Sequence, residues 1–240
     1  SQGDILVQNG TNAPVAAQTI INGAVDGGGT ITITGEDDVL FGADGDVSGV
    51  AGTVTVAALT GEIAMTDGAL VDSGSGLVNM DAEGNVTLGA LVTSTEVQVT
   101  SATGALVDGG DSAPDITAAT ASLRAETGVG TDADPLETVA DPGTTTLTVA
   151  ATTDTGDISL SNTGDLLVGT VDGLSGATIQ DTADINTGTD NITLVASSPL
   201  TVLAGAHVVD NGGGDITLTA TDDGGNDDHL TISANVTASG

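Results

Sequence analysis

An acidic turn near the end of the sequence has the residue types and spacing of a metal site. The turn at 222–228 contains Asp222, Asp223, Asp227 and Asp228 together with two glycines. Hard cations such as Ca²⁺ bind carboxylate and carbonyl oxygens, and this turn offers both in a flexible backbone. We therefore predict that these four aspartates bind calcium, with a solvated acidic turn as the alternative.

A second acidic motif begins like an EF-hand loop but does not complete one. Asp44, Asp46 and Ser48 fall at alternate positions, as the first ligands of such a loop do. The twelfth position is Thr55 where a bidentate glutamate is required, and no helical pattern flanks the motif. Calcium at the later turn is therefore the only cofactor that the sequence predicts.

The remaining side chains exclude most catalytic chemistry. The 240 residues include a single basic residue, Arg124, with two His and no Cys, Tyr or Trp. General-base catalysis and nucleophile activation usually combine such groups with a carboxylate or a hydroxyl. We therefore expect no enzymatic activity and assign no catalytic residue.

The charge balance limits the partners of the chain. A formal net charge of −33 repels phosphate backbones and anionic lipid headgroups, so we expect no binding to nucleic acid. No apolar run reaches the length of about 18 residues that a membrane-spanning helix needs, and we expect no membrane insertion. Divalent cations are the natural counterparts of so many carboxylates.

Short alternating segments dominate the secondary-structure pattern. Apolar and polar residues alternate in at least seven segments, and each is typical of a half-buried strand. Gly, Asp, Asn and Ser lie between them and favour turns. No segment has a sustained helical period. The segments are 30–34, 53–56, 85–88, 96–100, 157–160, 191–194 and 215–219.

The spacing of these segments predicts a repeating coil. Thr30 and Thr53 begin two of them 23 residues apart, and Asn191 and Asp215 begin two others 24 residues apart. A coil of about 20–24 residues holds three short strands, and coils stacked about 4.8 Å apart place equivalent residues on one another. We predict an all-β, single-stranded parallel β-helix, or β-solenoid, of about ten coils that is continuous over residues 1–240.

Two other fold classes fit the sequence less well than the solenoid does. High net charge and few aromatics are the signature of disorder, but the aliphatic residues here are abundant and patterned. An immunoglobulin-like sandwich normally shows a buried Trp or a corner Tyr, and the chain has neither. Within the solenoid, the segment 124–143 breaks the rhythm and is expected to form a loop excursion.

This segment also carries a family resemblance. The run from Ser122 to Thr138 contains a leucine strand, the turn Thr127-Gly128-Val129-Gly130 and the stop Pro135-Leu136-Glu137-Thr138. It resembles the repeats of filamentous-haemagglutinin-like bacterial surface proteins, over roughly residues 116–240 and by pattern in the first half. The resemblance implies a right-handed parallel β-helix exported to the cell surface, with roles in adhesion or in a matrix.

The functional expectation combines these observations. A Lys-free, Cys-free acidic solenoid is expected to be an extracellular or cell-surface structural module of bacterial origin. Reading 237–240 into 1–7 reproduces the strand start Gly-Asp-Ile of 156–158 and 214–216, which favours head-to-tail assembly of copies or of tandem repeats. The alternative is a surface module that binds calcium, another ligand or ice, because Thr-x-Thr rows suit an ice-binding face.

Overall fold

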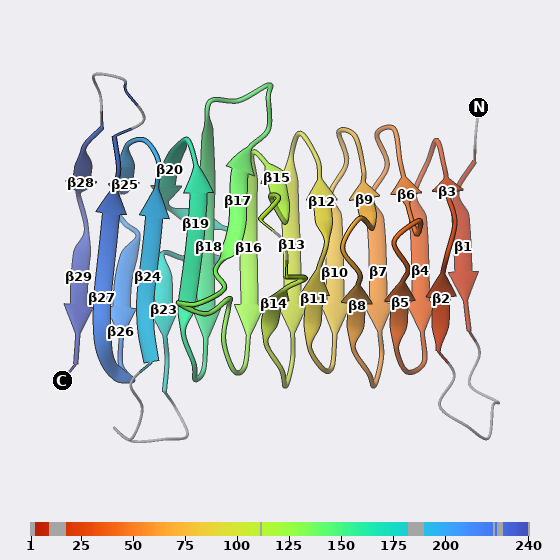
Figure 1. Cartoon of the computed structure of the whole chain (residues 1–240), viewed down its shortest axis with the longest axis horizontal. Helices are drawn as coiled ribbons and strands as arrows, with labels where there is room; N and C mark the ends of the chain where they lie inside the picture. Colours follow the sequence, from red (N-terminus) through yellow and green to blue (C-terminus); the bar gives the residue numbers. More distant parts are fainter. Residues whose placement is uncertain are drawn as a thin grey trace.

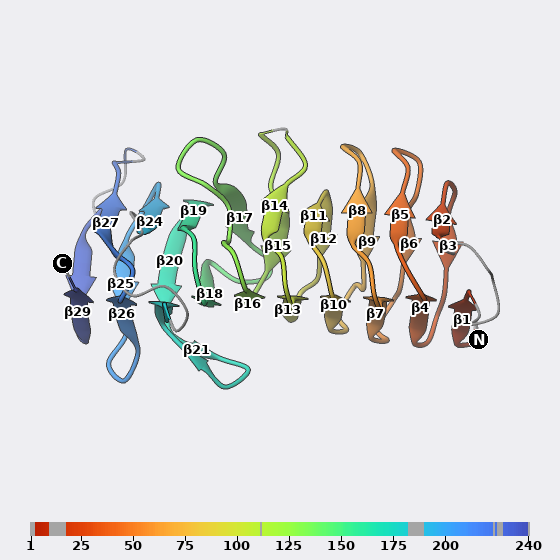
Figure 2. The same ribbon diagram turned by 90° about the horizontal axis from the view of Figure 1, so that it is seen from below.

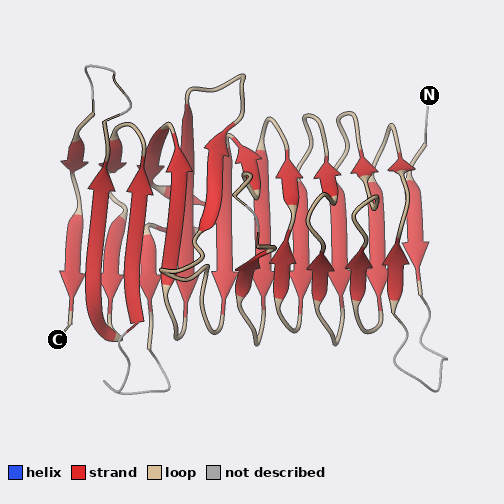
Figure 3. Cartoon of the chain, viewed as in Figure 1, coloured by secondary structure: helices blue, strands red, loops and turns tan. Residues whose placement is uncertain are grey.

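The chain winds into a stack of parallel coils. The computed structural model describes residues 3–9, 18–110, 112–181, 190–222, 224 and 228–239. Within these ranges the regular elements are 29 strands without a helix, and successive coils lie side by side from one terminus to the other (Figures 1 and 3). The predicted β-solenoid is therefore confirmed.

Three parallel sheets form the walls of the stack, with an additional two-stranded hairpin. The largest wall has 13 strands: β1 (Ile5–Gln8), β4 (Ile31–Gly35), β7 (Val54–Ala58), β10 (Val78–Ala82), β13 (Glu96–Ser101), β16 (Thr120–Ala125), β18 (Thr146–Thr153), β20 (Asp165–Val168), β23 (Ala177–Ile179), β25 (Leu200–Val202), β26 (His207–Asp210), β28 (Leu230–Ile232) and β29 (Asn235–Ala238).

The other two walls divide the opposite side of the coil between them. The five-stranded sheet contains β2 (Thr19–Ile21), β5 (Val39–Phe41), β8 (Ile63–Met65), β11 (Val86–Leu88) and β14 (Leu106–Asp108). The nine-stranded sheet contains β3 (Val25–Asp26), β6 (Val47–Ser48), β9 (Leu70–Asp72), β12 (Ala90–Val92), β15 (Ile116–Ala118), β17 (Leu136–Ala140), β19 (Ile158–Thr163), β24 (Asp190–Ala196) and β27 (Gly213–Ala220).

The core is a narrow column of aliphatic side chains in register. Ile31 pairs with Val54 and Ile33 with Val56, and all four are completely buried. Near the other end, β24 pairs with β27 so that Ile192 lies on Ile216 and Leu194 on Leu218. The sequence predicted these four pairs, and the structure confirms them. Small side chains suffice because the space between the walls is thin.

The stack has about nine coils, close to the ten that the repeat length predicted. The difference arises because several connections leave the walls. The segment 124–143 is not one continuous excursion. It contains strand β17 and the completely buried Val129, which bridges to both Leu106 and Ile158. Outside the end of β16, strand β17 and the isolated bridges, the segment consists of turns and loops.

A hairpin that the sequence pattern did not predict extends from the 13-stranded wall. Strands β21 (Thr170–Val171) and β22 (Leu174–Ser175) pair antiparallel, and the hairpin leaves the stack near β20 (Figure 2). The side chain of Arg124 holds it, with Nη1 2.8 Å from a carboxylate oxygen of Asp172. The single basic residue of the chain therefore forms its ion pair with Asp172 of the hairpin.

Stacked glycines fix the distance between coils at one corner. Gly29, Gly52 and Gly76 each lie two residues before a core position of the 13-stranded wall, in adjacent coils. A Cβ atom on Gly52 would lie 2.1 Å from the carbonyl oxygen of Gly29, and one on Gly76 would lie 2.0 Å from that of Gly52. A side chain at Gly52 or Gly76 would therefore collide with the backbone of the preceding coil.

The glycine corner predicts a large difference between two similar substitutions. Gly52→Ala should lower the free energy of unfolding by about 1–3 kcal/mol, because the added methyl group forces two coils apart. Gly23→Ala is the matched control, since a Cβ there has no neighbour within 4 Å. Thermal and urea unfolding followed by circular dichroism would measure both. Equal stabilities of the two variants would contradict the stacked corner.

Candidate functional site

The predicted calcium turn lies only partly within the described residues. Asp223 and Asp227 fall outside them. Asp222 is exposed and its Oδ1 accepts a hydrogen bond of 2.6 Å from the backbone N–H of Gly224, while Asp228 is half-buried. Calcium binding by these four aspartates stays a prediction.

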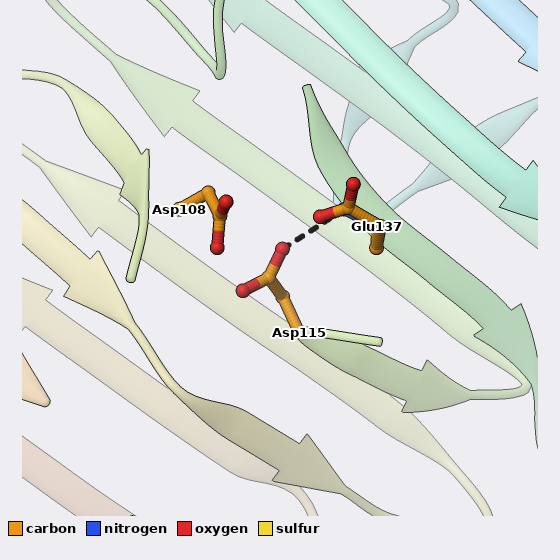
Figure 4. A group of neighbouring side chains, drawn as sticks. All are labelled: Asp108, Asp115 and Glu137. Atoms are coloured by element: carbon orange, nitrogen blue, oxygen red, sulfur yellow. Dashed lines mark hydrogen bonds between the residues drawn. The ribbon is translucent and has the colours of Figure 1, made fainter. Parts of the chain in front are cut away.

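A different acidic group lies inside the coil stack. Asp108, Asp115 and Glu137 each place one carboxylate oxygen within 4.8 Å of the others (Figure 4). Asp108 and Asp115 are buried, with 5% and 3% of their surfaces exposed, and Glu137 is half-buried. Within the described ranges, this is the one group of three or more acidic, His or Cys side chains with the spacing of a metal site.

The coil geometry brings these residues together. Asp108 ends β14 and occupies an inward position, because it pairs with the completely buried Leu88 of the preceding coil. Asp115 directly precedes β15 in the same coil. Glu137 lies in the next coil at the equivalent level, since Ile116 pairs with Thr138. The site therefore joins two coils at the place where the five-stranded sheet ends.

Hydrogen bonding and burial act in opposite directions on Asp115. The pKa of Asp115 is raised from 3.8 to about 8. Burial is the main cause, and the nearby carboxylates of Asp108 and Glu137 contribute to the rise. The backbone N–H of Glu137 donates a hydrogen bond of 2.9 Å to Asp115 Oδ2, which partly opposes the rise in pKa. Asp115 consequently holds a proton at neutral pH.

Two chemical states can neutralise this group. In the first, the proton on Asp115 is shared with Asp108 and reduces the repulsion between carboxylates. In the second, a hard divalent cation replaces the proton. Oxygen ligands at about 2.3–2.6 Å from one calcium ion lie no more than about 5 Å apart, and the three oxygens here lie within 4.8 Å of one another. The group therefore has the donor set and dimensions for either state.

A cavity of about 370 Å³ opens beside β14, and Asp108 of the acidic group forms part of its lining. Its lining includes Asp134, Asp157 and Asp190, with glycines on the adjoining turns. Burial raises the pKa of Asp157, although the backbone N–H of Asn191 donates a hydrogen bond of 2.7 Å to Oδ1 and opposes the rise. The basic Arg124 is not part of this lining. A cation or a neutral hydroxyl-rich molecule suits such a cavity better than an anion.

Comparisons with protein-family models, with curated proteins and with solved structures gave no match to this chain. The fold is compatible with β-helix repeat proteins in general, and the more specific resemblance to filamentous-haemagglutinin-like repeats rests on the sequence motifs alone. Among the described residues, no helix is long and apolar enough to cross a membrane.

The buried carboxylates predict a pH dependence of stability. Asp115 has a folded-state pKa above its ordinary value. Between pH 3.8 and about 8, the folded chain therefore keeps a proton on Asp115 that the unfolded chain has released. Stability should therefore fall as pH rises through this window, by up to about 1.4 kcal/mol per pH unit from this group.

The variant Asp115→Asn separates this effect from the other carboxylates. Asparagine resembles the protonated form, so the variant should lose most of the decline between pH 5 and 8. Urea unfolding at a series of pH values would compare the two proteins. Parallel stability curves for the wild type and the variant would show that Asp115 does not retain the proton.

Proposed function

We propose that this chain is a structural and adhesive β-solenoid module of an extracellular filament, matrix or surface fibre. In this proposal the coils of one unit continue into those of the next, either between separate copies or along one longer polypeptide. The observation that carries the proposal is the character of the end faces of the stack.

The last described coil presents its core residues to solvent. Leu230, Ile232 and Val236 are 42%, 49% and 38% exposed, although they pair with the completely buried Leu200, Val202 and Val208. The side chains at these positions point toward the core. Solvent therefore reaches them through the open end of the stack and not through a wall.

The first coil has the same character. Ile5 and Val7 of β1 are half-buried where Ile31 and Ile33 of the next coil are completely buried. Each end face thus combines an apolar centre with unpaired backbone groups of parallel strands, and both features match another coil.

The amino-acid composition supports two parts of this proposal, the extracellular location and the non-catalytic role. The chain lacks Lys and Cys, and most of its side chains are Thr, Gly, Ala, Val or acidic groups that build walls and turns. The sequence resemblance to filamentous-haemagglutinin-like repeats adds an adhesive or matrix role on the bacterial cell surface. A continuous apolar column supplies stiffness to such a fibre.

End-to-end assembly predicts polymers with a defined repeat. About nine coils at about 4.8 Å give a unit length of about 43 Å, which electron micrographs of concentrated protein should show as an axial repeat. Ile232→Asp should raise the concentration needed for assembly about tenfold or more, because it places a charge on the apolar end face.

Thr55→Asp is the matched control for this experiment. Thr55 points away from the core on β7, which lies between β4 and β10 in the middle of the stack, so the variant adds the same charge without altering an end face. Sedimentation over a range of concentrations would compare the three proteins. A wild type that stays monomeric at millimolar concentration, or equal effects of both substitutions, would contradict the proposal.

A cation-binding module is the second candidate, and the group of Asp108, Asp115 and Glu137 favours it. The ice-binding alternative has weaker support, because the Thr rows of the 13-stranded wall are irregular. Thr34 is followed in register by Ala57 and then by Asp81. A regular lattice of Thr pairs would need Thr at equivalent positions in consecutive coils.

Calcium should raise the melting temperature if the buried carboxylates bind it. The increase should be larger at pH 9 than at pH 6, because the ion competes with the proton on Asp115. Each kcal/mol of stabilisation corresponds to about 2–4 °C for a chain of this size. Melts in low salt, with calcium or with a chelator, would measure the shift.

Two variants assign the calcium effect to a site. Asp115→Asn should abolish the shift if the buried group binds the ion, whereas the double variant Asp222→Asn with Asp228→Asn should abolish it if the acidic turn does. Identical melting temperatures of the wild type with calcium and with chelator would exclude a structural role for the ion at both sites.

A further inference from the structure

The outer face of the five-stranded sheet carries a continuous uncharged row. In β2, β5, β8, β11 and β14 the central residue points outward, and the strand register places these residues on one line along the axis. They are Ile20, Leu40, Ala64, Thr87 and Val107. Ile20 is 55% exposed and Val107 is 37% exposed, so solvent reaches apolar surface at both ends of the row.

Carboxylates border this row on both sides. The turns that enter the five-stranded sheet contain Glu36, Asp37, Asp38, Glu62 and Glu83. The turns that leave it contain Asp44, Asp46 and Asp67. Both sets lie within the same three coils. The face therefore consists of an uncharged, mostly apolar line with negative margins within three of its five coils.

Charge complementarity identifies the kind of partner. A second copy of this chain would bring negative margins against negative margins, since the molecule has only one basic residue. A suitable partner presents aliphatic side chains flanked by Lys or Arg.

The spacing of the row identifies the shape of that partner. Neighbouring members are about 4.8 Å apart, which is close to the helical pitch of about 5.4 Å, whereas same-face residues of a strand are about 6.8 Å apart. The whole row spans about 19 Å, the length of a helix of about 13 residues.

We propose that this row is a docking site for a cationic amphipathic helix of a partner polypeptide. The helix lies along the solenoid axis with about one aliphatic side chain over each coil, and its basic residues reach the acidic margins. The site is on the side of the stack, so it is independent of the end faces and of axial assembly.

The probe for this site is a 14-residue peptide of Leu and Lys with a single Trp and its leucines along one helical face. The protein has no Trp or Tyr, so the fluorescence of the peptide reports binding without background. The described protein also has no helix, so a helical circular-dichroism signal on mixing arises from the peptide. A peptide of the same composition with scattered leucines is the control probe.

The variant Leu40→Asp separates apolar docking from simple charge attraction. It adds a negative charge, which should strengthen a purely electrostatic interaction with a cationic peptide. The proposal predicts the opposite result, a loss of affinity of about tenfold or more in 0.15 M salt, because an apolar contact is removed. Thr55→Asp adds the same charge on the outer face of the 13-stranded wall and should not weaken binding.

Three results would overturn the proposal. The first is equal or tighter binding of the peptide by Leu40→Asp, with its circular dichroism unchanged. The second is equal affinity for the peptide with scattered leucines. The third is lateral self-association of the wild type, with or without calcium, that Leu40→Asp abolishes, since this would make a second copy the occupant. Weaker binding by Leu40→Asp, together with a helical signal for the patterned peptide alone, would support it.

Discussion

Parallel backbone hydrogen bonding between coils is the interaction on which the whole structure depends. It fixes the rise of each coil at about 4.8 Å and places every wall residue directly on its equivalent in the next coil. As a consequence, the residues at equivalent positions of neighbouring coils must pack against one another. Ile31, Val54 and Val78 form one buried line, and Gly29, Gly52 and Gly76 form a corner that no side chain could share.

The same constraint determines how a chain with 34 acidic residues remains folded. None of the paired positions in the described strands joins two carboxylates. Asp26 lies on Ser48, which lies on Asp72, and Asp81 lies between Ala57 and Thr100. Alternation of this kind keeps like charges about two coils apart within a wall. Apart from the buried Asp115, the described acids outside the strands are in turns that solvent reaches and screens.

The sequence predicted most of the fold because stacking makes residue spacing informative. The 23-residue interval of the Thr-Ile-Thr and Thr-Val-Thr segments matched the register of Ile31 with Val54. The buried acidic group was missed because it depends on contacts across coils. One signal was available, since Asp108 follows Leu106 at the inward spacing of a strand. The pairing of Arg124 with Asp172 had no such signal, because the hairpin breaks the repeat.

Asp115 and Glu137 are where stacking and charge come into conflict beneath the surface of the stack, since Asp115 is buried and Glu137 is half-buried. They are equivalent residues of adjacent coils, as the half-buried Asp38 and the exposed Glu62 are elsewhere, but Asp115 is buried, so little water screens this pair. A buried pair of like charges is strongly unfavourable unless a proton or a cation neutralises it. The five-stranded sheet also ends at this level, so the neutralising species stabilises the junction between the two halves of the stack. Because burial raises the pKa of Asp115 to about 8, the stability of this junction depends on pH.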